Sequence, residues 1–183
     1  MLHPQIVEKP ALTVVGCETP FLHALSPTAT NIEVIGPLWG RFLSRAGEVA
    51  GRKGDEMYGV IYSRSEAERS HPDELQYIAG VAVENAGSLP AGMVSRTVDA
   101  GAFAVFLHRG PIQGIRDTVS QIYRDWLPRS GYLHTGVADV ELYDHRFCLD
   151  SADSIMEYWV SVTKRSPVNS EDSFSYNSQH APS

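Results

Sequence analysis

The chain has 183 residues, 43% of them hydrophobic and 20% charged, with a formal net charge of −7, which suits one compact domain that buries roughly 70% of its unfolded surface. The acidic balance disfavours direct nucleic-acid binding, which needs a basic surface, and it favours neutral or cationic small ligands. The N-terminus lacks the basic and apolar regions of a secretory signal, and no run approaches the ~18 apolar residues of a membrane span. We therefore expect a soluble, cytoplasmic protein without a membrane partner.

The first half of the chain predicts a strand, a helix and two further strands. Residues 11–18 are rich in β-branched side chains, and residues 31–49 carry apolar side chains at helical spacing. Pro37 predicts that the regular helix starts, or is kinked, near Gly36, because proline disrupts a helix beyond its first turn. Residues 57–63 and 75–85 follow as strands.

The second half repeats this order. Residues 93–110 are extended chain interrupted near Gly101, and residues 111–128 form the most regular amphipathic helix of the sequence. Residues 139–147 and 154–164 are two further strands. The fold class is therefore α+β, with duplicated βαββ halves related by a pseudo-twofold axis and an antiparallel sheet.

Two helices with one apolar stripe each can cover only one face of such a sheet. The opposite face must then be solvated, covered by another chain or hollowed into a site. We predict helices on one face and a ligand cleft on the other. Residues 1–165 are expected to form this single domain, and the Ser- and Asn-rich residues 166–183 are expected to be a disordered tail.

The strand at 154–164 carries an acid on a face that also carries an indole. Glu157 and Trp159 share one side, whereas Met156 and Tyr158 lie on the other. A partly desolvated carboxylate favours a cationic partner, and aromatic rings attract cations and flat apolar molecules. The alternative is that Glu157 faces water and that Trp159 only covers its neighbours on the sheet.

Seven segments in fixed order resemble one family across about residues 5–165. They are "PLWGRF", "YGVIYS", "YIAGVAV", "PAGMVSRTVDAGAFAVFLHRG", "IYRDWLPRSGY", "ELYDHRF" and "MEYWVSV". The succession resembles the GyrI-like small-molecule-binding domain, which also occurs as the effector-binding part of AraC- and MerR-type regulators. The resemblance implies a central cleft with a carboxylate and aromatic walls. It assigns Glu157 to the carboxylate and Trp39 to the wall, although Trp39 could also be plain core.

Other candidate residues carry weaker signals. Tyr58, Phe106 and Tyr143 are candidate ligand-binding walls, but aromatic residues in strands are also common in cores. Glu141 is interpreted as a solvated strand acid. His108 is expected to form a local hydrogen bond beside the second helix, with a catalytic role as the alternative. Histidine and cysteine spacing predicts no metal site, and we expect no cofactor.

Two classes of function remain open from the sequence. A stand-alone module could bind amphipathic, aromatic or cationic xenobiotics, either sequestering them or reporting them to a partner. The resemblance also implies an enzymatic branch that hydrolyses cyclopropanoid compounds for cellular protection, with Glu157 as the catalytic, water-orienting residue. A gyrase-inhibitor-like, protein-binding role rests on the family name alone. We expect no helix-turn-helix segment beside the domain, and a homodimer is compatible with the sheet edges.

Overall fold

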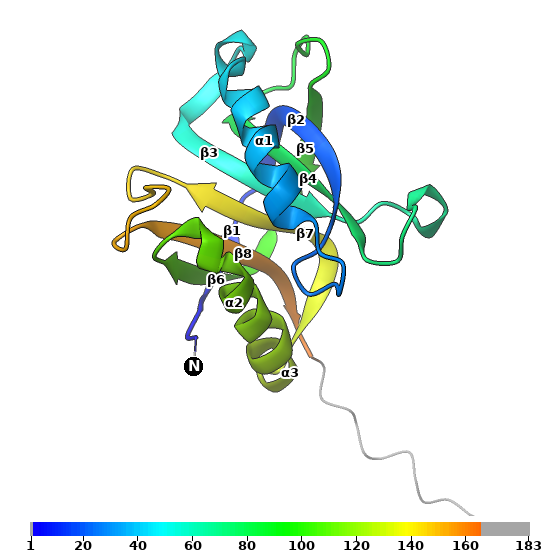
Figure 1. Cartoon of the computed structure of the whole chain (residues 1–183), viewed down its shortest axis with the longest axis vertical. Helices are drawn as coiled ribbons and strands as arrows, with labels where there is room; N and C mark the ends of the chain where they lie inside the picture. The colour runs from blue at the N-terminus through cyan, green and yellow to red at the C-terminus, as the bar shows by residue number, and fades with distance from the viewer. Residues whose placement is uncertain (1, 166–183) are drawn as a thin grey trace, which may run out of the picture.

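Within residues 2–165, eight antiparallel strands form one sheet in the order β1-β6-β8-β7-β3-β4-β2-β5. The computed structural model describes residues 2–165, and the arrangement of its elements is shown in Figure 1. The strands are β1 (Gln5–Lys9), β2 (Leu12–Leu22), β3 (Arg52–Tyr62), β4 (Glu74–Val83), β5 (Val94–Val98), β6 (Gly101–Arg109), β7 (Tyr132–Tyr143) and β8 (Ile155–Lys164).

The sheet is built from two halves that meet at its centre. Strands β2, β3 and β4 of one half and β6, β7 and β8 of the other are joined by the pairing of β3 with β7. Each half has its helix between its first and second of these strands. The predicted α+β class and the duplicated βαββ order are therefore confirmed.

Both helical segments lie on the same face of the sheet (Figure 1). Pro37 lies inside the first helix, which begins six residues earlier than the proline, so the predicted start near Gly36 is wrong. The second helical segment is composite, because a π-helical turn interrupts it. The helical elements are α1 (Asn31–Leu43), two single 3₁₀ turns (Ala46–Glu48 and Glu66–Glu68), a third 3₁₀ turn (Ile112–Gly114), α2 (Ile115–Ser120), the π-helical turn (Gln121–Trp126) and α3 (Leu127–Arg129).

His108 fixes the start of this second helical segment. Its Nε2 donates a hydrogen bond to the carbonyl of Pro111 at 3.1 Å, and its Nδ1 bonds with Thr118 Oγ1 at 2.8 Å. The side chain is buried beside both partners. This is the local hydrogen bond predicted from the sequence.

The sheet face opposite the helices is closed by the curl of the sheet itself. Residues 10–11 join β1 to β2, and residues 99–100 join β5 to β6, although each pair lies toward opposite edges of the sheet. The Cα atoms at the ends of each link can be at most about 11 Å apart, so the edges approach each other. A second hydrophobic core fills this curl, with Val60, Ile78, Val140 and Trp159 among its members. This is the face on which the sequence predicted the ligand cleft.

Several local expectations need correction. Strand β1 was not predicted, and β7 begins at Tyr132, seven residues before its predicted start. The tail predicted for residues 166–183 lies outside the described residues. Within residues 2–165, none of the helices combines the length and apolar character that crossing a membrane requires.

Candidate functional site

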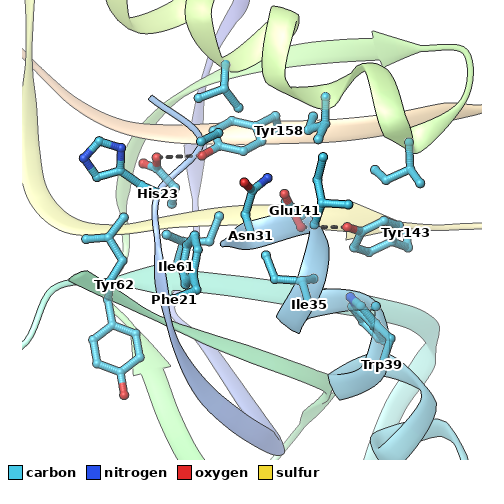
Figure 2. Close-up of a pocket in the computed structure, with 18 of the residues that line it drawn as sticks. Phe21, His23, Asn31, Ile35, Trp39, Ile61, Tyr62, Glu141, Tyr143 and Tyr158 are labelled. Carbon is cyan, nitrogen blue, oxygen red and sulfur yellow. Dashed lines mark hydrogen bonds between the residues drawn. The ribbon is translucent and has the colours of Figure 1, made fainter. Parts of the chain in front are cut away.

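A cavity of about 860 Å³ lies on the helix side of the sheet. Its walls come from α1 and from the second helical segment, and β3, β7 and β8 contribute its floor. Figure 2 shows side chains from these elements pointing into the same space. The prediction of a cleft on the face opposite the helices is therefore wrong, because the site and the helices share one face.

Glu141 is a buried carboxylate in the floor of this cavity. Its side chain lies on the central strand β7 and the residue is only 6% exposed. The hydroxyls of Tyr77 and Tyr143 both donate to Oε2, at 2.5 and 2.6 Å, and Figure 2 shows Glu141 beside Tyr143. Within residues 2–165, no group donates a hydrogen bond to Oε1. One carboxylate oxygen thus accepts two hydrogen bonds from the protein, and the other accepts none from the described residues.

Burial sets the electrostatics of this carboxylate. Desolvation raises the pKa of Glu141 above its ordinary value of 4.5, and the two tyrosine hydroxyls partly oppose that rise. The neighbouring charge of Asp139 adds to it. Burial also raises the pKa values of Tyr77 and Tyr143 well above 10, so both remain hydroxyl donors. A cation beside Oε1 would relieve the cost of the buried charge.

Trp39 connects α1 to this carboxylate. Its Nε1 donates to Tyr77 Oη at 3.1 Å, so Trp39, Tyr77 and Glu141 form a hydrogen-bonded chain. The indole also meets the ring of Tyr143 edge-on, with centroids 5.2 Å apart. The carboxylate therefore has an aromatic wall of the kind that attracts organic cations.

Gly59 makes room for the hydrogen bond between Tyr77 and Glu141. It lies on β3, directly opposite Glu141 in the pairing with β7. A Cβ atom at this position would overlap Tyr77 Oη and would lie 2.7 Å from Glu141 Oε2. The glycine is required here by a close approach of side chains.

Asp139 forms a second polar centre in the same cavity. Its Oδ2 accepts hydrogen bonds from the hydroxyls of Tyr123 and of Tyr158, the latter at 3.1 Å. Its Oδ1 lies 3.0 Å from Nε2 of His134. The hydrogen bond to Asp139 raises the pKa of His134 above 6.5 despite opposing desolvation. The π-helical turn presents Tyr123, and such turns often occur at functional sites.

Neither carboxylate was predicted from the sequence as part of the site. Asp139, Glu141 and Tyr143 alternate along β7, so they share one face of the sheet. That alternation indicates one polar face. Glu141 was interpreted as a solvated acid, which is wrong because its side chain is buried. The sequence alone could not show that this face lies under the helices.

The six predicted site residues separate into three groups. Trp39 and Tyr143 line the cavity. Phe106 is buried in the core on the helix side, where its ring meets Trp126 edge-on at 5.0 Å. The remaining three, Tyr58, Glu157 and Trp159, do not line the cavity; Tyr58 and Trp159 pack in the core on the other side of the sheet.

Both oxygens of Glu157 already have partners. Arg146 donates to Oε1 at 2.7 Å, and Trp159 Nε1 donates to Oε2 at 2.8 Å. Lys9 lies over the Trp159 ring, 3.8 Å from its centroid. The acid and indole predicted to hold a ligand thus bond to each other and to basic side chains. The carboxylates that line the cavity are those of Asp139 and Glu141.

The fold and the cavity define a class of protein. Two βαββ halves that enclose a largely apolar cavity with a buried carboxylate form a small-molecule-binding domain. The sequence profile of the GyrI-like small-molecule-binding domain matches residues 2–163. The chain belongs to this family, as its sequence predicted.

One known relative is similar to this chain in sequence, and two solved structures are similar to it in fold. The chain is 35% identical over 147 residues to the transcriptional regulator BrlR of Pseudomonas aeruginosa, covering 80% of this chain and 50% of BrlR. It therefore spans about half the length of that relative. SAV2435 bound to tetraphenylphosphonium has a similar fold, with a TM-score of 0.68, 15% identity and coverage of 88% of this chain and 94% of that one. The C-terminal domain of EcmrR matches with a TM-score of 0.61, 18% identity and coverage of 90% and 99%.

Proposed function

We propose that this domain binds amphipathic aromatic cations in the cavity between its helices. The observation that carries the proposal is Oε1 of Glu141, which accepts no hydrogen bond from residues 2–165 and belongs to a buried side chain that lines a largely apolar cavity. Tetraphenylphosphonium, the molecule bound to the similar SAV2435, belongs to this chemical class. Such a ligand combines one positive charge with a large apolar surface.

The surroundings of Glu141 favour a hydrophobic cation over a hydrated one. Ile35 and Met57 line the cavity, and at its edge Ile32, Leu43 and Leu149 are exposed apolar side chains. Burying apolar ligand surface against them contributes about 25 cal/mol per Å². A small inorganic cation would lose its hydration without this compensation. Charge and apolar area together select the ligand class.

Binding of this kind needs no chemical reaction. It can sequester a xenobiotic, or it can report the compound to a partner, as the relationship to a transcriptional regulator suggests. The hydrolytic alternative relied on Glu157 to orient water, and that carboxylate lies outside the cavity with both oxygens occupied. A ligand that gains the mass of one water during incubation with the protein would show that the domain also hydrolyses its ligand.

Two acid-to-amide variants test the assignment of the carboxylate. Glu141→Gln should weaken tetraphenylphosphonium binding by about 10- to 100-fold, because it removes the negative charge that attracts the cation within a buried site of low dielectric. Glu157→Gln serves as the matched control and should leave the affinity within about twofold. Both affinities can be measured by titration calorimetry, with neutral triphenylphosphine oxide as the reference ligand. The reverse pattern between the two variants would refute the proposal.

Cation affinity should also fall in acid. Protonation removes the charge of Glu141 as the pH drops through its raised pKa, so the loss begins at a higher pH than for an ordinary glutamate. Protonation of His134 acts in the same direction, because it adds positive charge to the cavity. Calorimetry of Glu141→Gln across the same pH range separates the two, since this variant retains only the histidine contribution. An affinity that rises in acid would contradict the proposed charge partner.

A further inference from the structure

The two carboxylates of the cavity have the same construction. In Glu141, one oxygen accepts both hydrogen bonds from tyrosine hydroxyls, those of Tyr77 and Tyr143. In Asp139, one oxygen likewise accepts from two tyrosines, Tyr123 and Tyr158. Both acids line the same cavity and lie two positions apart on β7, so they are about 7 Å apart along the strand.

The two centres differ at the second oxygen. Oε1 of Glu141 has no donor within residues 2–165, whereas Oδ1 of Asp139 is 3.0 Å from Nε2 of His134. His134 itself lines the cavity. Its imidazole is therefore the partner of the second oxygen of Asp139, whereas the second oxygen of Glu141 has no such partner among the described residues.

An irregularity in β7 brings His134 to this position. It lies five positions before Asp139, which in a regular strand would put the two about 16 Å apart and on opposite faces. The pairing of β7 with β8 shifts register between these residues, and Gly136 within the shift has a φ of 78°. Such bulges redirect side chains, and here the bulge folds His134 back onto Asp139.

We propose that Asp139 is a second cation subsite and that His134 fills it as a resident cation, which restricts the cavity to ligands with one positive charge. The inference rests on the proposed cation-binding function and adds a residue that determines specificity. His134 neutralises Asp139 when it is protonated, so a second ligand charge has nothing to pair with. Without the imidazole, both carboxylates would present a free oxygen to the same ligand.

The groups that can titrate in this centre come from three elements. Asp139 and His134 lie on β7, Tyr158 on β8 and Tyr123 on the π-helical turn. Burial raises the pKa values of both tyrosines well above 10, so neither changes charge near neutral pH. His134, with a raised pKa, is the group whose charge then changes in that range. Glu141 is the next acid along the strand.

A matched pair of permanent cations tests the subsite. Benzyltrimethylammonium carries one charge, and p-xylylenebis(trimethylammonium) carries two charges on opposite sides of one benzene ring. In His134→Ala, the dication should bind about tenfold more tightly than in the wild type, whereas the monocation, which pairs with Glu141, should gain less than threefold in affinity. His145→Ala, which removes an exposed histidine, should change neither affinity. Calorimetry on folded protein, verified by circular dichroism, provides the values.

The pH dependence of binding separates a charge role of His134 from a purely structural one, because only the charge role changes with pH. Wild-type affinity for the dication should rise relative to that for the monocation as the pH rises through the His134 pKa, and this ratio should be flat in His134→Ala. His134→Gln, which keeps a donor without the charge, should lie between the two and replaces the alanine variant if that does not fold. A dication that gains no affinity in either variant overturns the inference. Tetraphenylphosphonium binding in the same samples shows separately whether the proposed function holds.

Discussion

Gly59→Ala should reduce tetraphenylphosphonium affinity at least as much as removal of the Glu141 charge and should also destabilise the fold. The new Cβ would overlap the hydroxyl of Tyr77, a fully buried side chain, and would press on Glu141. Either the tyrosine or the carboxylate must move, and the hydrogen bond between them is then lost. Overpacking of this kind costs about 1–3 kcal/mol. For a domain of this size we expect a melting temperature lower by about 3–10 °C.

Gly40→Ala is the matched control for this substitution. Gly40 also lines the cavity, but a Cβ there would meet nothing within 4 Å. Because Gly40 lies within α1, alanine should stabilise the helix by up to about 1 kcal/mol. Gly59→Ala should therefore lower both the melting temperature and the tetraphenylphosphonium affinity. Gly40→Ala should leave the affinity unchanged and should leave or raise the melting temperature. Equal losses in both variants would show that the cavity does not depend on the space at Gly59.

The sequence predicted the order of elements because each helix and strand has its own periodicity. The stripe along the first helix, the apolar run of β4 and the alternation in β8 depend on local sequence alone, and the structure has a helix or strand at each of these places. β1 was missed because its five residues, Gln5–Lys9, have too little alternation to stand out. Its role depends on pairing with β6, almost 100 residues away in the chain.

The choice of sheet face could not be made from the sequence. Alternation in β8 separates Glu157 and Trp159 from Met156 and Tyr158, but it does not say which pair lies under the helices. Both faces carry apolar side chains because the sheet curls around a second core. The side with the acid and indole was interpreted as the site, and the helix-side cavity instead contains Tyr158.

The contact between His134 and Asp139 illustrates a second limit. A bulge has no periodic signature, and the only hint is a glycine within "HTGVAD". Regular spacing would place these two side chains on opposite faces. Such a site depends on a local break in the pattern from which the strand itself was predicted.

The two tryptophans predicted to form one site should affect different properties when each is replaced by alanine, ligand affinity for Trp39 and stability for Trp159. Trp39→Ala should lower tetraphenylphosphonium affinity by about 30- to 100-fold, because it removes a cation-binding ring and leaves Tyr77 without its indole donor. Trp159→Ala should leave the affinity nearly unchanged. That residue is 7% exposed and packs in the core across the sheet, so its removal should instead cost about 3–5 kcal/mol of unfolding free energy.

The two roles of Trp39 can be separated by a conservative variant. Trp39→Phe keeps an aromatic face toward the cavity but loses the hydrogen bond to Tyr77, so it should recover most of the affinity lost in Trp39→Ala if the ring is what the cation contacts. Calorimetry and urea unfolding of the three variants provide affinity and stability from the same preparations. A Trp159→Ala protein that stays folded but loses cation binding would place the ligand on the Glu157 side of the sheet. In that case the free oxygen of Glu141 would have to be explained by a different ligand.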